Sequence, residues 1–142
     1  MRVKKLYADS RLPEKGSEFA AGFDLFAHVD EPVTIHPHET VMISTGLAME
    51  IPEGYFGGIY ARSGIASKKG LRPANCTGVV DADYRGEVFV SLHNDSDEYR
   101  TISSGDRIAQ LIIHKFFDMP MEVATELSET VRGSGGFGST GK

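Results

Sequence analysis

Short apolar or β-branched runs separated by polar turns dominate the pattern of hydrophobic positions along the chain. The runs lie at residues 33–35, 41–45, 58–60, 88–92 and 108–117. Turn-forming clusters fall between them, at residues 36–39, 52–54, 94–97 and 103–106. Short strands at this spacing are typical of an all-β sandwich or barrel and not of alternating β/α units. We therefore predict an all-β fold with one short helix at residues 64–69.

Composition places few restrictions on function but excludes some classes. A chain of 142 residues with 40% hydrophobic residues suits a single domain with a real core. The net charge of −5 argues against a nucleic-acid partner. Cys76 is the only cysteine, which fits a reducing compartment. No run approaches the roughly 18 apolar residues of a membrane span. These features predict a soluble cytoplasmic protein with no membrane partner.

The most unusual polar segment is a turn between two apolar runs. Residues 78–86 read GVVDADYRG, so two carboxylates, an aromatic ring and a guanidinium share one tight turn. A turn needs none of these groups for its own geometry. A rigid hairpin that presents a base, a flat ring and a cation is one way to build a small-molecule site.

Three other polar residues stand in places that require an explanation. Asp24 lies in the apolar run AGFDLFA, so it either faces solvent or pairs with a cation, a metal or backbone donors. Ser63 follows a strand and either caps a helix or helps present free N–H groups to an anion. Gln110 interrupts an apolar strand, as a satisfied core amide or as a site residue.

The end of the chain differs from the rest. Residues 129–142 are rich in Gly and Ser and cannot bury enough surface to order themselves. The segment is either a floppy tail or an arm that orders over a ligand. Phe137 favours the arm, because an isolated ring there has nothing local to pack against. We predict a β domain over residues 1–128 and an arm over residues 129–142.

Five segments in a fixed order resemble the motifs of the trimeric dUTPases, the deoxyuridine triphosphate nucleotidohydrolases. They are AGFDLFA (21–27), ARSGIA (61–66), GVVDADYRG (78–86), GDRIAQLII (105–113) and RGSGGFGSTG (132–141). All five together are highly specific. The resemblance implies a jelly-roll-like subunit and a homotrimer in which the tail of one subunit closes over a site built by the other two. It also implies hydrolysis of dUTP to dUMP and pyrophosphate, which lowers dUTP and supplies dUMP for thymidylate synthesis.

The resemblance further implies roles for individual residues. Asp81 is expected to activate a water for in-line attack on the α-phosphorus, and Gln110 to hold that water. Asp24 is expected to support Mg²⁺ through water. The implied substrate-binding residues are Arg62, Ser63, Gly64, Asn75, Gly78, Val80, Asp83, Tyr84, Arg132, Phe137, Gly138, Ser139 and Thr140.

Substrate selection follows from some of these roles. Tyr84 would lie against the deoxyribose and crowd a ribose 2′-hydroxyl. Asn75 and backbone groups of residues 78–84 would read uracil, whose donor and acceptor pattern cytosine reverses. Phe137 would stack on the base. Phe23 stands where the family usually has Tyr, and Ala61 where Pro is common.

Two alternatives stay open at this point. A dCTP deaminase shares the fold but needs a catalytic Glu on the strand after the hairpin, where Ser91 stands in this chain. A nucleotide-dependent regulatory binding protein is the other, and extra inserted segments would favour it.

Overall fold

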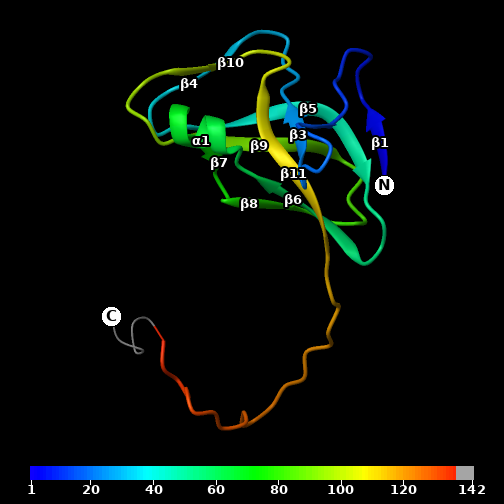
Figure 1. The fold of residues 1–142 in the computed structure, drawn as a ribbon, viewed down its shortest axis with the longest axis vertical. Helices are drawn as coiled ribbons and strands as arrows, with labels where there is room; N and C mark the ends of the chain where they lie inside the picture. The colour runs from blue at the N-terminus through cyan, green and yellow to red at the C-terminus, as the bar shows by residue number, and fades with distance from the viewer. Residues whose placement is uncertain (137–142) are drawn as a thin grey trace.

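The computed structural model describes residues 1–136, and these form a mostly antiparallel β structure with one short helix (Figure 1). The predicted all-β class and the predicted helix are confirmed. The elements are β1 (Arg2–Lys5), β2 (Glu14–Lys15), β3 (Phe23–Phe26), β4 (Val33–Ile35), β5 (Thr40–Glu50), β6 (Tyr55–Tyr60), α1 (Ser63–Lys69), β7 (Leu71–Pro73), β8 (Thr77–Val80), β9 (Glu87–Asn94), β10 (Arg100–Ile102) and β11 (Arg107–Lys115).

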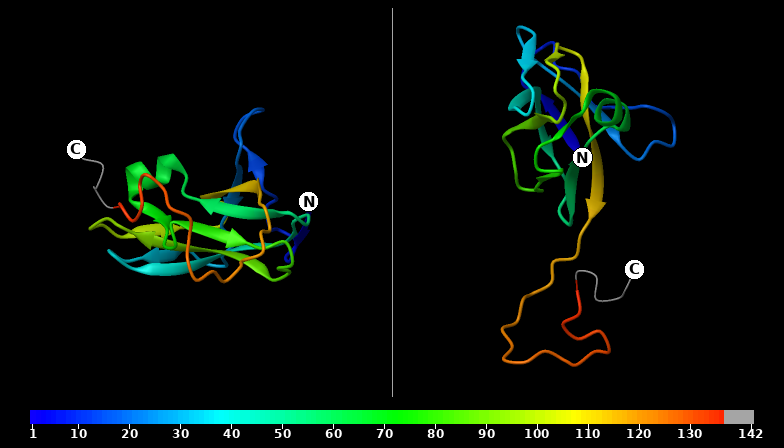
Figure 2. Two further views of the ribbon diagram at one scale, coloured as in Figure 1. Left: turned by 90° about the horizontal axis from the view of Figure 1, so that it is seen from below. Right: turned by 90° about the vertical axis from the view of Figure 1, so that its left-hand side faces the viewer.

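Two sheets make up the body of the molecule (Figures 1 and 2). One has four strands in the order β1-β5-β9-β7, and the other has five in the order β2-β3-β11-β6-β8. Strands β10 and β4 form a separate two-stranded ribbon. No helix among the described residues is long and apolar enough to cross a membrane.

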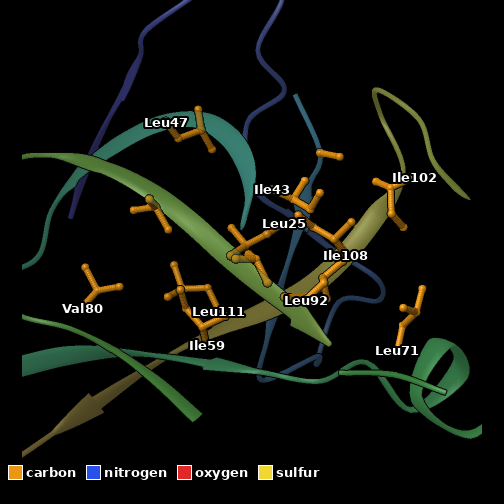
Figure 3. Close-up of a cluster of buried hydrophobic side chains, with 14 of the residues drawn as sticks. Leu25, Ile43, Leu47, Ile59, Leu71, Val80, Leu92, Ile102, Ile108 and Leu111 are labelled. Atoms are coloured by element: carbon orange, nitrogen blue, oxygen red, sulfur yellow. The ribbon is translucent and has the colours of Figure 1, made fainter. Parts of the chain in front are cut away.

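The core lies between the two larger sheets and follows from alternation along the strands. In β9, Val88, Val90 and Leu92 are buried while the residues between them are more exposed. This is the period of two that places alternate side chains on opposite faces. Leu25 and Leu111 from the five-stranded sheet belong to the same cluster (Figure 3). Burial of these side chains is the main term that stabilises the body.

A bulge in β5 holds the start of β9, just after the turn at residues 81–86. The pairing of β5 with β9 shifts in register between Ser44 and Ala48. Gly46 lies in this bulge with φ 64°, and a side chain there would overlap Ser10 Oγ. Glu87 Oε1 accepts hydrogen bonds from the Gly46 N–H at 3.0 Å and from the Ser44 hydroxyl. The first residue of β9 is thereby tied to the neighbouring strand.

The loop between β7 and β8 is held by an ion pair. Arg72 donates to both carboxylate oxygens of Asp95, at 2.7 and 3.0 Å, and to the carbonyls of Pro73 and Ala74. The hydrogen bond from the Arg72 guanidinium holds the pKa of the Asp95 carboxyl below its ordinary value. The pair therefore fixes the backbone that leads to Asn75.

The chain leaves the body after its last strand. β11 ends at Lys115, and Figure 1 shows the following residues running away from both sheets. The apolar side chains in this segment are exposed, among them Val123, Leu127 and Val131. The predicted arm boundary at residue 128 stays a prediction, but departure from the sheets begins earlier.

Replacing Leu111 with Ala should lower the free energy of unfolding by about 2–5 kcal/mol, because it removes buried methyl groups and leaves a cavity. Leu111 is fully buried, whereas Leu12 is 51% exposed, so Leu12→Ala serves as the matched control and should cost much less. Urea denaturation at one fixed protein concentration measures both. Equal losses for the two variants would contradict the placement of the core.

Replacing Asp95 with Asn should lower the urea midpoint at neutral pH and have little effect at low pH. A lowered folded pKa means that the carboxylate stabilises the fold above its ordinary pKa of 3.8, and that this contribution is lost as the pH falls through the lower folded value. Urea midpoints of the two proteins, measured at pH values from 7 downward, should therefore converge. A gap that stays constant with pH would show that the charge of Asp95 is not involved.

Candidate functional site

A pocket of about 280 Å³ lies beside the turn that follows β8. Its size is near the lower end for small-molecule sites, about 300 Å³. The pocket brings together five residues that the sequence analysis singled out, namely Asn75, Gly78, Val80, Asp81 and Tyr84. It also contains residues that were not predicted, namely Met42, Ile59, Val79, Glu87, Val88 and Phe89.

Hydrogen bonds within the turn determine how it presents Asp81 and Tyr84. The Tyr84 N–H donates to the Asp81 carbonyl at 3.2 Å, which closes the turn. Arg85 donates to the carbonyls of Ala82 and Tyr84, at 2.6 and 2.9 Å. The Asp81 side chain is left exposed at the rim of the pocket, and the Tyr84 ring is 45% exposed. Arg85 therefore stabilises the turn instead of pointing into the pocket.

Asn75 reaches the pocket from a tight turn. The Thr77 N–H donates to the Asn75 carbonyl at 2.6 Å, and Cys76 has φ 60°. A side chain at Gly78 would lie 3.4 Å from Asn75 Nδ2 and 3.2 Å from Ile59 Cβ. The missing side chain at Gly78 therefore lets its backbone pack closely against Ile59 and Asn75 in the wall of the pocket.

A second cluster is centred on Asp24, where β3, β6 and β11 meet. Arg62 donates to Asp24 Oδ1 at 2.7 Å and to Oδ2 at 3.2 Å, and Arg107 Nε also lies 3.4 Å from Oδ2. Asp24 is only 9% exposed. The alternative that it faces solvent is therefore wrong, and its partner is a pair of cations. A carboxylate this buried needs such partners to stay ionised.

Gln110 belongs to the same cluster. It lies opposite Asp24 on β3 and opposite Tyr60 on β6, and its Nε2 donates to the Ala61 carbonyl at 2.9 Å. A side chain at Gly22 would come within 2.6 Å of Gln110 Oε1. The amide nitrogen thus has a backbone partner on the segment that leads into α1.

The first residues of α1 do not have the roles that one sequence-based interpretation gave them. Arg62 is the N-cap residue and has no side-chain capping bond, while Ser63 is the first helical residue. The interpretation of Ser63 as an N-cap is therefore wrong. Ser63 and Gly64 are both exposed, and no acidic residue occupies the first turn. The Ser63 side chain and the Gly64 backbone are therefore accessible to a ligand.

Strand register separates the pocket residues around Asp81 from the cluster around Asp24 and Gln110. β6 pairs with β8 on one side and with β11 on the other, with Val80 opposite Gly57 and Gln110 opposite Tyr60. Asp81 follows Val80, so it is displaced from Gln110 by four residues along the strand direction. At about 3.4 Å per residue this amounts to about 14 Å, before the spacing across the strands is added. One subunit therefore does not bring Asp81 and Gln110 to the same atom.

The remaining predicted residues lie elsewhere. Asp83 lines a different hollow of about 520 Å³ on the other side of the turn, together with Arg2 and Arg85. Arg132 is exposed in the C-terminal segment, where its Nε donates to the Gly135 carbonyl at 2.8 Å. Four predicted residues fall outside the described part of the chain, namely Phe137, Gly138, Ser139 and Thr140.

Two of the unpredicted residues had a recognisable signal in the sequence. Phe89 lies between the buried Val88 and Val90, so alternation places an aromatic ring outward at 41% exposure. Arg107 follows Asp106, the last residue of the turn-forming cluster at residues 103–106. Asp106 fixes that turn by accepting from the Ser103 N–H at 2.8 Å, while Arg107 reaches back to Asp24. The role of Glu87 depends on the β5 bulge and had no local signal.

The described residues contain no group of three or more His, Cys, Asp and Glu side chains that could hold a metal. Both oxygens of Asp24 face guanidinium groups. The residues around Asp24 are thus paired with one another, and a cation beside them would also lie near two guanidinium groups. They do not form a dedicated protein cage.

Comparison with known sequences identifies the family. A family model described as dUTPase matches residues 8–141. The chain is 50% identical over 139 residues to the deoxyuridine 5′-triphosphate nucleotidohydrolase of Hydrogenobaculum sp., across 98% of this chain and 96% of that protein. It is 48% identical over 132 residues to the protein of the same name from Desulfitobacterium hafniense, across 92% and 87%.

Solved structures that resemble this chain are also dUTPases. The dUTPase of Staphylococcus bacteriophage 80alpha, determined with dUPNHPP, has a TM-score of 0.89 and 32% identity over 99% of this chain and 98% of that one. A mutant dUTPase from phage phi11 of S. aureus has a TM-score of 0.81 and 28% identity over 90% and 98%, and its structure describes the coordination of a structural Mg(II) ion. This chain therefore belongs to the dUTPase family.

Proposed function

We propose that this protein hydrolyses dUTP to dUMP and pyrophosphate at active sites shared between subunits of a homotrimer. The observation that carries the proposal is the separation of Asp81 from Gln110 by strand register. The residues for one reaction are all present, but in one subunit they lie in two places. A symmetric assembly that brings the two places of different subunits together resolves this, since closed homo-oligomers are the common form of symmetric assembly.

The pocket beside the turn suits a deoxyuridine. The Asn75 amide and the backbone of the residues from Gly78 onward line the pocket and would offer polar groups to the edge of a flat base. Uracil presents an N–H donor next to carbonyl acceptors, and cytosine would leave buried groups without partners. The Tyr84 ring at the pocket rim would lie against the sugar and crowd a 2′-hydroxyl.

Asp81 would act as the general base. Its side chain is exposed at the pocket, where a carboxylate could accept a proton from water. The water oxygen forms a bond to the α-phosphorus, and the bond from that phosphorus to the bridging oxygen breaks. Pyrophosphate leaves with the electron pair, and the proton goes to Asp81.

The Asp24 cluster would serve a neighbouring subunit's substrate. Gln110 would hold the attacking water, and Arg62, Ser63 and Gly64 would contact phosphate oxygens. Asp24 would keep Arg62 in place through its ion pair. Mg²⁺ would be held mainly by the triphosphate, with Asp24 reached through water, and it would neutralise charge on the phosphates.

The C-terminal segment would complete the site. Its exposed apolar side chains, Val123, Leu127 and Val131, are costly in water and suit packing on another subunit. An arm anchored in this way would bring Arg132, Ser139 and Thr140 to the β- and γ-phosphates. Phe137 would then stack on the base.

Deaminase chemistry is disfavoured by β9. That reaction needs a free Glu on the strand after the turn, and Glu87 is the only Glu in β9. Its Oε1 accepts bonds from Ser44 and Gly46, so the carboxylate is already occupied. Ser91 stands further along the same strand and carries no carboxylate.

Incubation with Mg²⁺ and each deoxynucleoside triphosphate should yield dUMP and pyrophosphate from dUTP, with little product from dCTP, dTTP or UTP. Asp81→Asn should lower kcat for dUTP by about 10²–10⁴-fold, the usual contribution of a general base. Binding of a non-hydrolysable dUTP analogue should survive, because the variant keeps the shape of the pocket. Chromatography of products and calorimetry of binding measure the two effects.

Asp97→Asn is the matched control, since Asp97 is exposed and pairs with His38 far from the turn. It should retain wild-type kcat. Normal turnover by Asp81→Asn would show that the base is another group, and ammonia release from dCTP would reassign the reaction.

Deleting residues 133–142 should sharply reduce turnover of dUTP and leave the thermal unfolding midpoint of the body almost unchanged. The described part of this segment makes hydrogen bonds only to residues 130–135, so its loss removes no contact with the sheets. Steady-state kinetics and calorimetric melting test the two halves. Full activity of the truncated protein would remove the arm from the mechanism.

A further inference from the structure

We infer that Gly86 and Glu87 are positioning residues for the Tyr84 ring and thereby set the discrimination between deoxyribose and ribose. The inference rests on the proposed function and adds to it the device that holds the selective ring in place. It follows from contacts among three parts of the structure: the turn, the first residue of β9 and the bulge in β5.

The Tyr84 ring lies on an exposed turn, away from the core. It is 45% exposed, so packing alone does not fix its orientation. The Tyr84 hydroxyl donates a hydrogen bond to the Glu87 carbonyl at 2.9 Å, and the ring therefore folds back over the turn. This bond determines which face of the ring borders the pocket shared with Asp81.

Gly86 lies directly beneath the folded ring. A side chain there would overlap the Tyr84 hydroxyl and would lie 2.6 Å from Cζ and 3.0 Å from Cε2. The backbone of Gly86 is not in the left-handed region, so alanine is compatible with its conformation. The space that Gly86 leaves is therefore required by Tyr84 and not by the turn itself.

Glu87 supplies the carbonyl that accepts the Tyr84 hydrogen bond. Its carboxylate accepts from the Gly46 N–H at 3.0 Å and from the Ser44 hydroxyl, both in the β5 bulge. The carbonyl that receives the Tyr84 hydroxyl is thus attached to the four-stranded sheet through the side chain of the same residue. Successive hydrogen bonds thus connect the four-stranded sheet to the Tyr84 ring.

A displaced ring would affect the two substrates differently. Tyr84 excludes a 2′-hydroxyl only if the ring lies close to the sugar, and a shift of about 1 Å is enough to change such discrimination. Attack on the α-phosphorus depends on Asp81, which precedes the ring in the turn. Displacement should therefore change the ratio of kcat/KM for dUTP to that for UTP more than it changes kcat for dUTP.

The test is Gly86→Ala, measured as this ratio. We expect the ratio to fall by about tenfold or more. Gly16→Ala is the matched control, because Gly16 has open space around it and an ordinary backbone conformation, and it should leave the ratio unchanged. An unchanged ratio for Gly86→Ala, with UTP still rejected, would overturn the inference.

Two further comparisons separate positioning from a general loss of structure. In a Tyr84→Ala background, Gly86→Ala should have no additional effect on the ratio, because the two residues act through one contact. Glu87→Gln keeps the acceptor oxygen and should retain more of the ratio than Glu87→Ala. A lower melting temperature with an intact ratio in both Gly86→Ala and Glu87→Ala would mean a structural role only.

The outcome for the wild type distinguishes this inference from the proposed function. A wild-type protein that does not hydrolyse dUTP overturns the proposed function. A wild-type protein that hydrolyses dUTP and rejects UTP, with a Gly86→Ala variant that does the same, overturns the inference alone. Calorimetric affinities for non-hydrolysable dUTP and UTP analogues give the same ratio without relying on turnover.

Discussion

Antiparallel pairing of β6 with β8 and β11 is the constraint on which the site depends. Each pair has one register, because a slip by one residue would turn the buried face of the strand outward. With Val80 opposite Gly57 and Gln110 opposite Tyr60, the carboxylate of Asp81 and the amide of Gln110 are held at different ends of the sheet. The core that fixes the register therefore also separates the two groups that we propose act in catalysis.

Each half of the site is supported by its own local contacts. Around the turn, the support is a set of backbone hydrogen bonds together with Glu87 and its bonds to β5. At the other half, the buried Asp24 carboxylate forms ion pairs with Arg62 and Arg107. Because Arg62 is the N-cap residue of α1, the first of these pairs holds the start of the helix in place. Both halves are rigid because they are built on strands, and rigid support is what a precisely aligned reaction requires. The described part of the C-terminal segment, residues 129–136, makes no hydrogen bond to the sheets.

The fold class was predictable because alternation and turn residues are local signals. Four of the predicted runs overlap the longer strands β5, β6, β9 and β11, and α1 differs by one residue at its start. Gly78, Val80, Asp81 and Tyr84 were predictable as pocket residues because one short motif contains them all. The partners of Asp24 and the role of Glu87 were not, since they come from segments far apart in sequence. Arg62 is 38 residues from Asp24, and Gly46 is 41 from Glu87. Only the fold brings such residues together.

Mixed assemblies of two inactive variants measure the central claim most directly. Asp81→Asn and Gln110→Ala damage different halves of the site, so separately prepared proteins should both be nearly inactive. After the two are unfolded together and refolded in equal amounts, random assortment gives about a quarter of the sites one intact half from each variant. The account predicts recovery of dUTP hydrolysis to about a quarter of the wild-type rate. No recovery, with wild-type subunits refolding normally under the same conditions, would show that one subunit holds the whole site.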